Sequence, residues 1–335
     1  RHAHRRAVLD RVTVAGPDRS TAATAPTGAP SDARAAEILR RLEIDVTHRL
    51  DGILHGNFQG LVPGHGSEPG EAREYQPGDD VRRIDWNVTA RTNHAHIRET
   101  IADRELETWI VADRSASLDF GTRTWEKRDL VLAASAGVGF LTARGGNRIG
   151  AVVSTDSGIA TLPARQGRTH LMAVLSRIQG AQRSDTPGES DHATLAELLA
   201  RAAAAARRRG LAVVISDYLD PPDTWRHPLA ALAVRHEVLC VEVLDPRELE
   251  LPAMGTLTLI DTETGRVREV DTNRKGLRER FAQAAAEQRA TIGATIRGAG
   301  AHHLRLRTDE DWLLALARHV ATGRRRHANV NPGRR

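Results

Sequence analysis

The sequence has little cysteine, few aromatic residues and no long apolar run. Cys240 is its single cysteine, so no disulfide can form within the chain, which favours a reducing compartment. Aromatic residues make up 3% of the chain, too few for the stacking platforms of single-stranded nucleic-acid binding. No stretch approaches the roughly 20 apolar residues of a membrane-spanning helix, and the first residues lack the apolar core of a signal peptide. These absences predict a cytoplasmic protein with no transmembrane segment.

The positive charge of the chain lies at its two ends. The net charge is +5, but residues 1–6 and 324–335 hold eight arginines and no acidic residue, which leaves −3 for the rest of the chain. The body therefore lacks the basic excess that phosphate binding requires, and no nucleic-acid partner is expected. Both ends are predicted to be disordered, as a small-residue leader over residues 1–30 and a basic tail over residues 323–335.

Two small units are predicted ahead of the main domain. Residues 31–55 carry apolar side chains at helical spacing and predict an N-terminal helix. Residues 56–104 are rich in Gly, Pro and Asp, which is typical of turns between short strands and predicts a small β-rich module. The apolar residues of the helical stripe are Ile38, Leu39, Leu42, Val46 and Leu50.

From residue 105 to residue 322 the pattern predicts an α/β domain. Segments such as LAVVIS (211–216) and VLCVEV (238–243) are almost entirely apolar, which is typical of strands buried on both faces. These strands alternate with helical patterns, which predicts a mostly parallel sheet with helices on both faces. The sequence has no internal repeat and no glycine pattern of a Walker or dinucleotide-binding site.

Small oxygen-bearing side chains follow two of these strands. Asp113, Ser115 and Ser117 come after one apolar run, and Asp217 ends LAVVIS. Because parallel strands end at one edge of the sheet, these oxygens converge if the two strands are neighbours. Mg²⁺ prefers such oxygen ligands. The alternative is a strand-end turn, in which Asp and Ser hydrogen-bond their own backbone.

The strand-end residues and three longer segments of the chain resemble a known family. Asp113-x-Ser115-x-Ser117 with a distant Asp217 resembles the metal-ion-dependent adhesion site of von Willebrand factor type A domains. Residues 35–320 resemble one branch of these, the domain of unknown function 58 (DUF58) family. The matching segments are YQPGDDVRRIDWNVTARTNHAHIRE (75–99), VVISDYLD (213–220) and EVLDPRELELPAMGTLTLIDTETG (242–265).

The resemblance implies a fold, a metal and a partner. The fold is a von Willebrand A-like (Rossmann-like) sheet, and the metal is Mg²⁺ or Mn²⁺. The partner is a MoxR-type AAA+ ATPase, with other von Willebrand A proteins as further candidates. The family site also has a threonine from a middle loop, for which Thr194 is the candidate. Because Ala193 replaces the usual glycine before it, Ser190 and Asp191 are alternatives.

The segment GDDVRRIDWNVTAR (78–91) has two interpretations. Its clustered charges form a structural ion network around Trp86 on a strand after the Pro77-Gly78 turn, or they form a recognition surface for the partner. The recognition surface would consist of Arg82, Asp85, Trp86 and Arg91. The nearby His94 and His96 are expected on one face of a strand, and no third ligand at familiar spacing supports a zinc site there.

Two functions follow from a metal at the strand ends. In the first, the protein is a non-enzymatic adaptor, and an acidic side chain of a partner completes the metal's coordination. In the second, Asp113 and Asp217 hold a metal that activates water for hydrolysis. Hydrolysis needs a general base, and His192, in the loop of Thr194, is the only histidine close in sequence to a predicted ligand. The Gly-x-Ser-x-Gly motif of serine hydrolases is absent. The adaptor is favoured, and no catalytic residue is predicted.

Overall fold

The computed structural model describes most of the chain after residue 106 and several shorter pieces before it. The described residues are 12–14, 39–40, 42–44, 46, 48–49, 72–75, 84, 86–92, 94–98, 107–122, 125–143, 146–155, 158–180, 193–261 and 267–320. The basic tail predicted over residues 323–335 lies outside them, as does most of the predicted leader.

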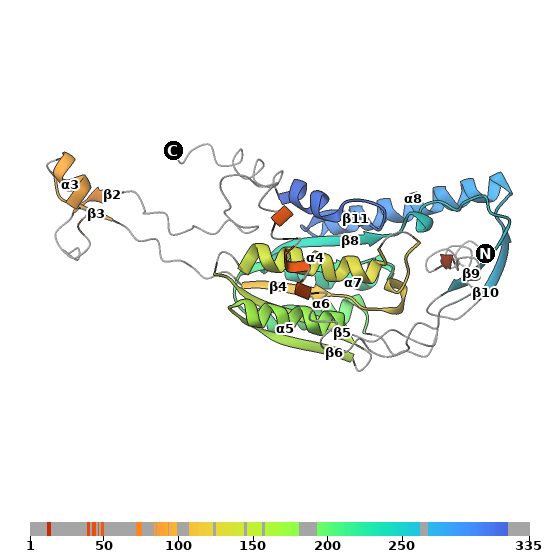
Figure 1. Ribbon diagram of the computed structural model, residues 1–335, viewed down its shortest axis with the longest axis horizontal. Helices are drawn as coiled ribbons and strands as arrows, with labels where there is room; N and C mark the ends of the chain where they lie inside the picture. The colour runs from red at the N-terminus through yellow and green to blue at the C-terminus, as the bar shows by residue number, and fades with distance from the viewer. Residues whose placement is uncertain are drawn as a thin grey trace.

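A six-stranded sheet forms the centre of the protein (Figure 1). Its strand order is β11-β8-β7-β4-β5-β6, and every pair of neighbours is parallel except β5 and β6. The predicted mostly parallel sheet is therefore confirmed. The strands are β4 (Glu107–Ala112), β5 (Arg148–Thr155), β6 (Gly158–Arg165), β7 (Gly210–Ser216), β8 (Glu237–Leu244) and β11 (His302–Arg307).

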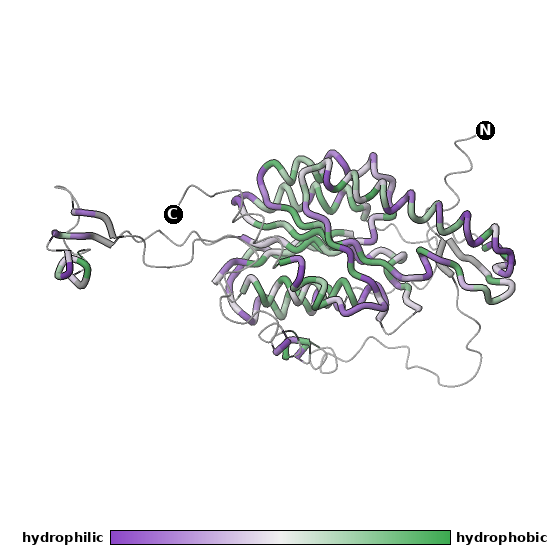
Figure 2. The backbone as a smooth tube through the Cα atoms, turned by 90° about the horizontal axis from the view of Figure 1, so that it is seen from above, coloured by the Kyte–Doolittle hydropathy of each residue, from purple (hydrophilic) through white to green (hydrophobic). Residues whose placement is uncertain are grey.

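Helices cover both faces of the sheet, as predicted. Alternate side chains of β4 enter opposite cores: Ile110 packs in the cluster that contains Leu130 of α4, and Val111 packs in the cluster that contains Trp225 of α7. Figure 2 shows the hydrophobic strands between the two helical layers. Because both faces are covered, the central strands β4, β7 and β8 are mostly apolar. The helices are α4 (Lys127–Ala143), α5 (Arg168–Gln179), α6 (Leu195–Ala205), α7 (Pro222–Arg235) and α8 (Lys275–Gly298), with a further helical segment over residues 312–320.

The N-terminal helical stripe packs on the same face as α4 and α5. Leu39 and Val46 are buried in that core, and Leu42 packs against it. Arg168 of α5 donates from Nε to Glu43 Oε1 across 2.6 Å, which adds an ion pair at the contact. The predicted stripe is confirmed at these described positions.

A β-hairpin extends beyond one end of the sheet (Figure 1). It consists of β9 (Thr256–Asp261) and β10 (Val267–Asp271), which pair antiparallel. β1 (Val12–Val14) pairs antiparallel with β9, so the predicted disorder of the leader is wrong for these three residues. Val-Thr-Val is a β-branched run, and such a run adds readily to an open strand edge.

The described part of the small module contains two short strands and a helix. β2 (Ala72–Glu74) pairs antiparallel with β3 (His96–Arg98), while α3 spans Trp86–Thr92. The strand expected through this region is therefore wrong at Trp86–Thr92. The helix contains neither Gly nor Pro, and Asp85 before it is a residue type favoured at a helix start. His94 precedes β3, so the expectation that His94 and His96 share a strand face is also wrong.

Candidate metal site at the carboxyl edge of the sheet

The site lies at the carboxyl ends of two neighbouring strands. After these strands the chain continues into helices on opposite faces of the sheet. β4 leads to α4 on one face, whereas β7, its hydrogen-bonded neighbour, leads to α7 on the other. Such a reversal opens a crevice at the carboxyl ends of parallel strands. The backbone N–H of Asp113 donates to the carbonyl of Ile215 across 3.0 Å, so the residue after β4 stays beside the end of β7.

The structure brings together four of the five predicted ligands. Asp113 Oδ1 accepts from the Ser115 backbone N–H at 2.9 Å, and its Oδ2 accepts from Ser216 Oγ at 2.8 Å. The hydroxyls of Ser115 and Ser117 are 3.1 Å apart, and Ser117 also hydrogen-bonds the carboxylate of Asp217. The strand-end turn after β4 and the cluster of oxygen atoms therefore occur together. The turn places the hydroxyls of Ser115 and Ser117 beside the end of β7.

The two carboxylates are buried but differ in electrostatics. Asp113 is 6% exposed and Asp217 is 2% exposed. Burial, followed by the negative charge of Asp217, raises the pKa of Asp113 to about 6. Burial opposes ionisation of Asp217 too, but the charge of Lys127 and the hydrogen bond from Ser117 hold the pKa of Asp217 below its ordinary value. A cation would compensate the negative charge that Asp113 and Asp217 share.

The oxygen atoms of the site fit a magnesium-like ion. An octahedral ion with ligands at ~2.1 Å places adjacent ligand oxygens about 3 Å apart. The hydroxyl oxygens of Ser115 and Ser117 are 3.1 Å apart, which agrees with this spacing of adjacent ligands. Among the described residues, no group of three or more His, Cys, Asp and Glu side chains could hold a metal. The donor set is therefore two carboxylates and two hydroxyls, which suits an ion that retains several waters.

Thr194 is not joined to the other four predicted ligands by any described contact. It is an exposed N-cap of α6, where its hydroxyl accepts from the Glu197 backbone N–H and donates to Glu197 Oε2 at 2.9 Å. The next N–H, of Leu195, donates to Asp220 Oδ2 at 2.9 Å. Asp220 also contributes to the raised pKa of Asp113, so Asp220 connects this loop with the site. Ser190, Asp191 and His192 lie outside the described residues.

Tyr218 is a site residue that sequence patterns did not indicate. With φ of 55°, it is the single non-glycine residue of the described chain with positive φ. This conformation is rare for a bulky side chain and requires support from its surroundings. The buried ring packs edge-on against Trp225 at 5.4 Å, and its hydroxyl donates to the Val214 carbonyl at 2.9 Å. These contacts fix the backbone directly after Asp217.

Lys127 is the second functional candidate that the patterns missed. Its ammonium group is fully buried and contacts Asp217 Oδ2 at 2.9 Å and Glu248 Oε1 at 2.6 Å. A signal was present in the composition, because Lys127 and Lys275 are the chain's only lysines among 48 basic residues. The other 46 are arginines, so a lysine at the start of a buried helix stands out.

The predicted recognition segment is only partly visible. Arg82 and Asp85 lie outside the described residues. Trp86 is 71% exposed at the start of α3, and Arg91 is exposed on the same helix. Most charges of the predicted ion network lie outside the described residues, so the ion network and the recognition surface both stay predictions.

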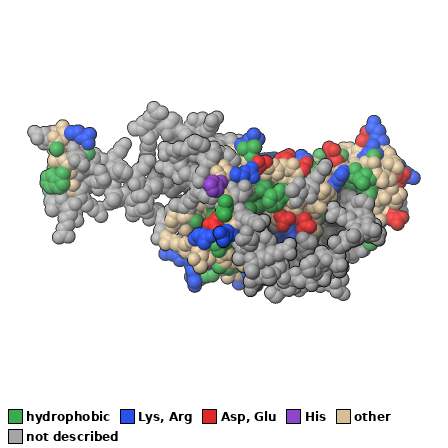
Figure 3. Space-filling model, in the orientation of Figure 1, with side chains coloured by type: hydrophobic (Ala, Val, Ile, Leu, Met, Phe, Trp, Pro, Cys, Tyr) green, Lys and Arg blue, Asp and Glu red, His purple; other side chains and the backbone are tan. Residues whose placement is uncertain are grey.

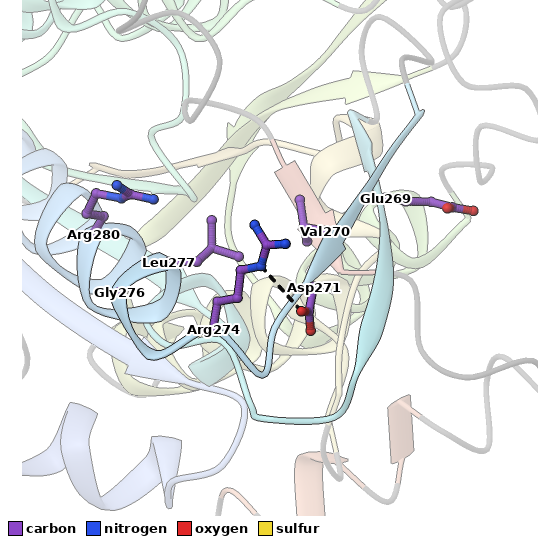
Figure 4. A pocket seen from close by; sticks show the side chains of 7 residues that line it. All are labelled: Glu269, Val270, Asp271, Arg274, Gly276, Leu277 and Arg280. Carbon is purple, nitrogen blue, oxygen red and sulfur yellow. Dashed lines mark ion pairs between the residues drawn. The ribbon is translucent and has the colours of Figure 1, made fainter.

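The described surface has no extended area of one charge on the face shown in Figure 3, where basic and acidic side chains are interspersed. A recess of about 500 Å³ lies between β10 and the start of α8 (Figure 4). Its lining includes the ion pair of Arg274 and Asp271, 3.4 Å apart, together with Leu277 and Val270. None of the predicted ligands lines it. No helix among the described residues is long and apolar enough to cross a membrane.

The fold and site define an α/β protein with a candidate cation site at the carboxyl edge of a mostly parallel sheet. The chain belongs to the family described as "Protein of unknown function DUF58", whose model matches residues 71–291. It is 53% identical over 294 residues to "Uncharacterized protein Rv1480" of Mycobacterium tuberculosis, a match that covers 88% of this chain and 91% of the relative.

Solved structures give weaker matches. BatB from Bacteroides thetaiotaomicron matches 66% of this chain and 99% of its own, with 14% identity and a TM-score of 0.39. The SpRpn10 VWA domain matches 64% of this chain and 94% of its own, with 12% identity and a TM-score of 0.35. VWA is the abbreviation for von Willebrand A. Similarity at these scores says nothing about function.

Proposed function

We propose that this protein is a non-enzymatic adaptor that binds Mg²⁺ or Mn²⁺ at the Asp113 site and uses the metal to bind a partner. The observation that carries the proposal is the convergence of Asp113, Ser115, Ser117 and Asp217 from the ends of two neighbouring strands. When bound, the metal would supply an open coordination position for an acidic side chain of the partner. Asp113, Asp217, Ser115 and Ser117 would hold the ion, and the two carboxylates would also balance its charge.

The contacts of the carboxylates support an adaptor over a hydrolase. Asp113 uses one oxygen for the Ser115 N–H and the other for Ser216, while Asp217 Oδ2 accepts from Lys127. A general base must instead have an oxygen aimed at a water molecule or substrate. These carboxylates are held as structural acceptors and charge partners, which suits a rigid binding site.

The proposed partner is a MoxR-type AAA+ ATPase, on the basis of the family resemblance given above. A carboxylate of the ATPase that completes the metal's coordination would be a charge-assisted contact in a partly desolvated place. The exposed Trp86 and Arg91 of α3 are proposed as a second contact surface, since exposed aromatic and arginine side chains are common binding anchors.

The test compares the wild type with Asp113→Asn for binding to a purified MoxR-type ATPase from the same genome. Mg²⁺ and nucleotide are kept constant, so the ATPase's own metal requirement does not differ between samples. Loss of the metal contact should weaken binding by roughly one to three decades. Asp223→Asn, an exposed acidic position in the first turn of α7, is the matched control and should bind like the wild type. Equal affinity of all three proteins would contradict the adaptor role of the metal. Turnover of phosphate or carboxylic esters by the wild type but not by Asp113→Asn would favour the hydrolase.

A further inference from the structure

The buried ammonium group of Lys127 lies directly behind the candidate metal site. Its Nζ donates to Asp217 Oδ2 at 2.9 Å and to Glu248 Oε1 at 2.6 Å, and its side chain is 0% exposed. Two carboxylates within 2.9 Å compensate the buried ammonium group. The site therefore contains a positive charge beside one of its two carboxylates.

The choice of lysine at this position fits its surroundings. The rest of the chain uses arginine at every basic position except Lys275, which is exposed. An ammonium is a compact charge on a flexible stem, whereas a guanidinium is a broad planar fork. The compact group suits a fully buried position between Asp217 and Glu248, which come from different loops.

The charges around Lys127 connect the site with a second segment. Glu248 ends the short helix η3 (Pro246–Glu248), where its Oε2 accepts from the Asp245 N–H at 3.1 Å. Arg289 of α8 donates to the carbonyl of Asp217 at 3.0 Å and lies 3.8 Å from Glu248. Lys127 therefore contacts the metal site on one side and a structural carboxylate on the other.

We propose that Lys127 is a built-in cation that lowers the metal affinity of the site by neutralising Asp217. This inference rests on the proposed metal site. Asp113, Asp217 and Glu248 bring three negative charges and Lys127 brings one positive charge, so a divalent ion meets a net charge of −2 from these four groups. Because the group is buried, its charges are weakly screened and each one changes the affinity strongly.

The proposal predicts opposite effects for the two ends of the Lys127–Glu248 pair. Lys127→Met makes the local charge more negative and should bind Mg²⁺ at least about tenfold more tightly than the wild type. Glu248→Gln leaves the ammonium less compensated and should bind Mg²⁺ at least about tenfold more weakly. The double variant restores the net charge and should bind close to the wild type. A pair that only holds the loops in place would weaken binding in all three variants.

The experiment is titration calorimetry of the full chain with MgCl₂ and with MnCl₂, with circular dichroism to confirm folding of each variant. Lys275→Met is the matched control, because it removes the chain's other lysine from an exposed position. It should bind like the wild type. Mg²⁺ affinity of Lys127→Met equal to or below that of the wild type would overturn the inference about Lys127. The metal site itself would still be supported if the wild type binds Mg²⁺. Absence of binding by both the wild type and Lys127→Met would overturn the metal site itself.

A second readout applies if Lys127→Met does not fold. In wild-type protein labelled with ¹⁵N-lysine, the chain's two lysines give at most two side-chain resonances, and the Lys275→Met variant identifies the one from Lys127. Addition of Mg²⁺ should shift that resonance, because the ion binds the carboxylate that the ammonium contacts. A resonance that does not move at saturating Mg²⁺ would contradict the proposal, as would Glu248→Gln binding as tightly as the wild type.

Discussion

The hydroxyl of Ser216, the last residue of β7, donates to the carboxylate of Asp113, the first residue after β4, across 2.8 Å. The same Ser216 oxygen accepts from the backbone N–H of Tyr218 at 3.0 Å. One side chain therefore links the two strand ends and supports the strained residue after Asp217. This link explains how loops 103 residues apart keep a fixed relation at the candidate site.

Substitution of Asp113 tests the metal site directly. Asp113→Asn removes the negative charge but keeps an oxygen that can accept from the Ser115 N–H, so the fold should persist. Mg²⁺ and Mn²⁺ binding should fall by at least about tenfold, since a neutral amide is a poorer partner for a divalent ion. Calorimetric titration measures this, with Asp223→Asn as the control. Unchanged affinity in Asp113→Asn would remove Asp113 from the site.

Loss of the link between the strands should reduce stability. Ser216→Ala leaves one oxygen of Asp113 and the N–H of Tyr218 without their partner in a buried place. Such a loss costs about 1–3 kcal/mol of the free energy of unfolding. Urea unfolding followed by fluorescence measures it. The control is Ser176→Ala, at an exposed position of α5, which should stay within about 0.5 kcal/mol of the wild type. Equal stability of the two variants would contradict the link.

The acid dependence of stability should include a contribution from Glu242. Burial opposes ionisation of Glu242, but the hydrogen bond from His303 and the charges of Arg289 and Arg305 hold its pKa below the ordinary 4.5. As the pH falls, the unfolded chain therefore takes up the proton first. The stability that this carboxylate provides is present above pH 4.5 and is lost as the pH falls through the lowered pKa.

Glu242→Gln tests this contribution. The variant should be less stable at pH 7 by roughly 3 kcal/mol, because the buried Arg289 loses a carboxylate partner. Its stability should also change less between about pH 5 and pH 3 than that of the wild type. Urea unfolding at a series of pH values measures both effects, with the exposed Glu279→Gln as the control. Parallel curves for wild type and Glu242→Gln would show that Glu242 has no lowered pKa.

The single thiol should be inert in the folded protein. Cys240 is fully buried in β8, and burial raises the pKa of its thiol to about 12. The thiolate is the reactive species, so a thiol reagent should modify the native protein only through unfolding. Reaction with Ellman's reagent should give one equivalent within minutes in denaturant and far less in native buffer. Rapid stoichiometric labelling of the native protein would show that Cys240 is accessible.

Several features of the fold could be predicted from local patterns. The apolar runs ending before Asp113 and Asp217 are strands, because residues that are buried on both faces have no polar alternation. Patterns failed where the local signal was mixed. Trp86–Thr92 lies in a Gly-, Pro- and Asp-rich stretch that favours turns and short strands, yet it forms a helix. Thr194 is a candidate through the family resemblance and stays a prediction, and its hydroxyl takes part in the capping box of α6.

The sequence by itself determined the alternation of strands and helices and the oxygen-rich residues at two strand ends, because both are patterns along short stretches of one chain. Only the tertiary structure decided that β4 and β7 are neighbours and that Lys127 reaches a carboxylate 90 residues away. It also decided that Tyr218 adopts positive φ beside that carboxylate. Pairing between distant segments depends on how the two cores pack and on which buried charges must be compensated. Local periodicity carries no information on either.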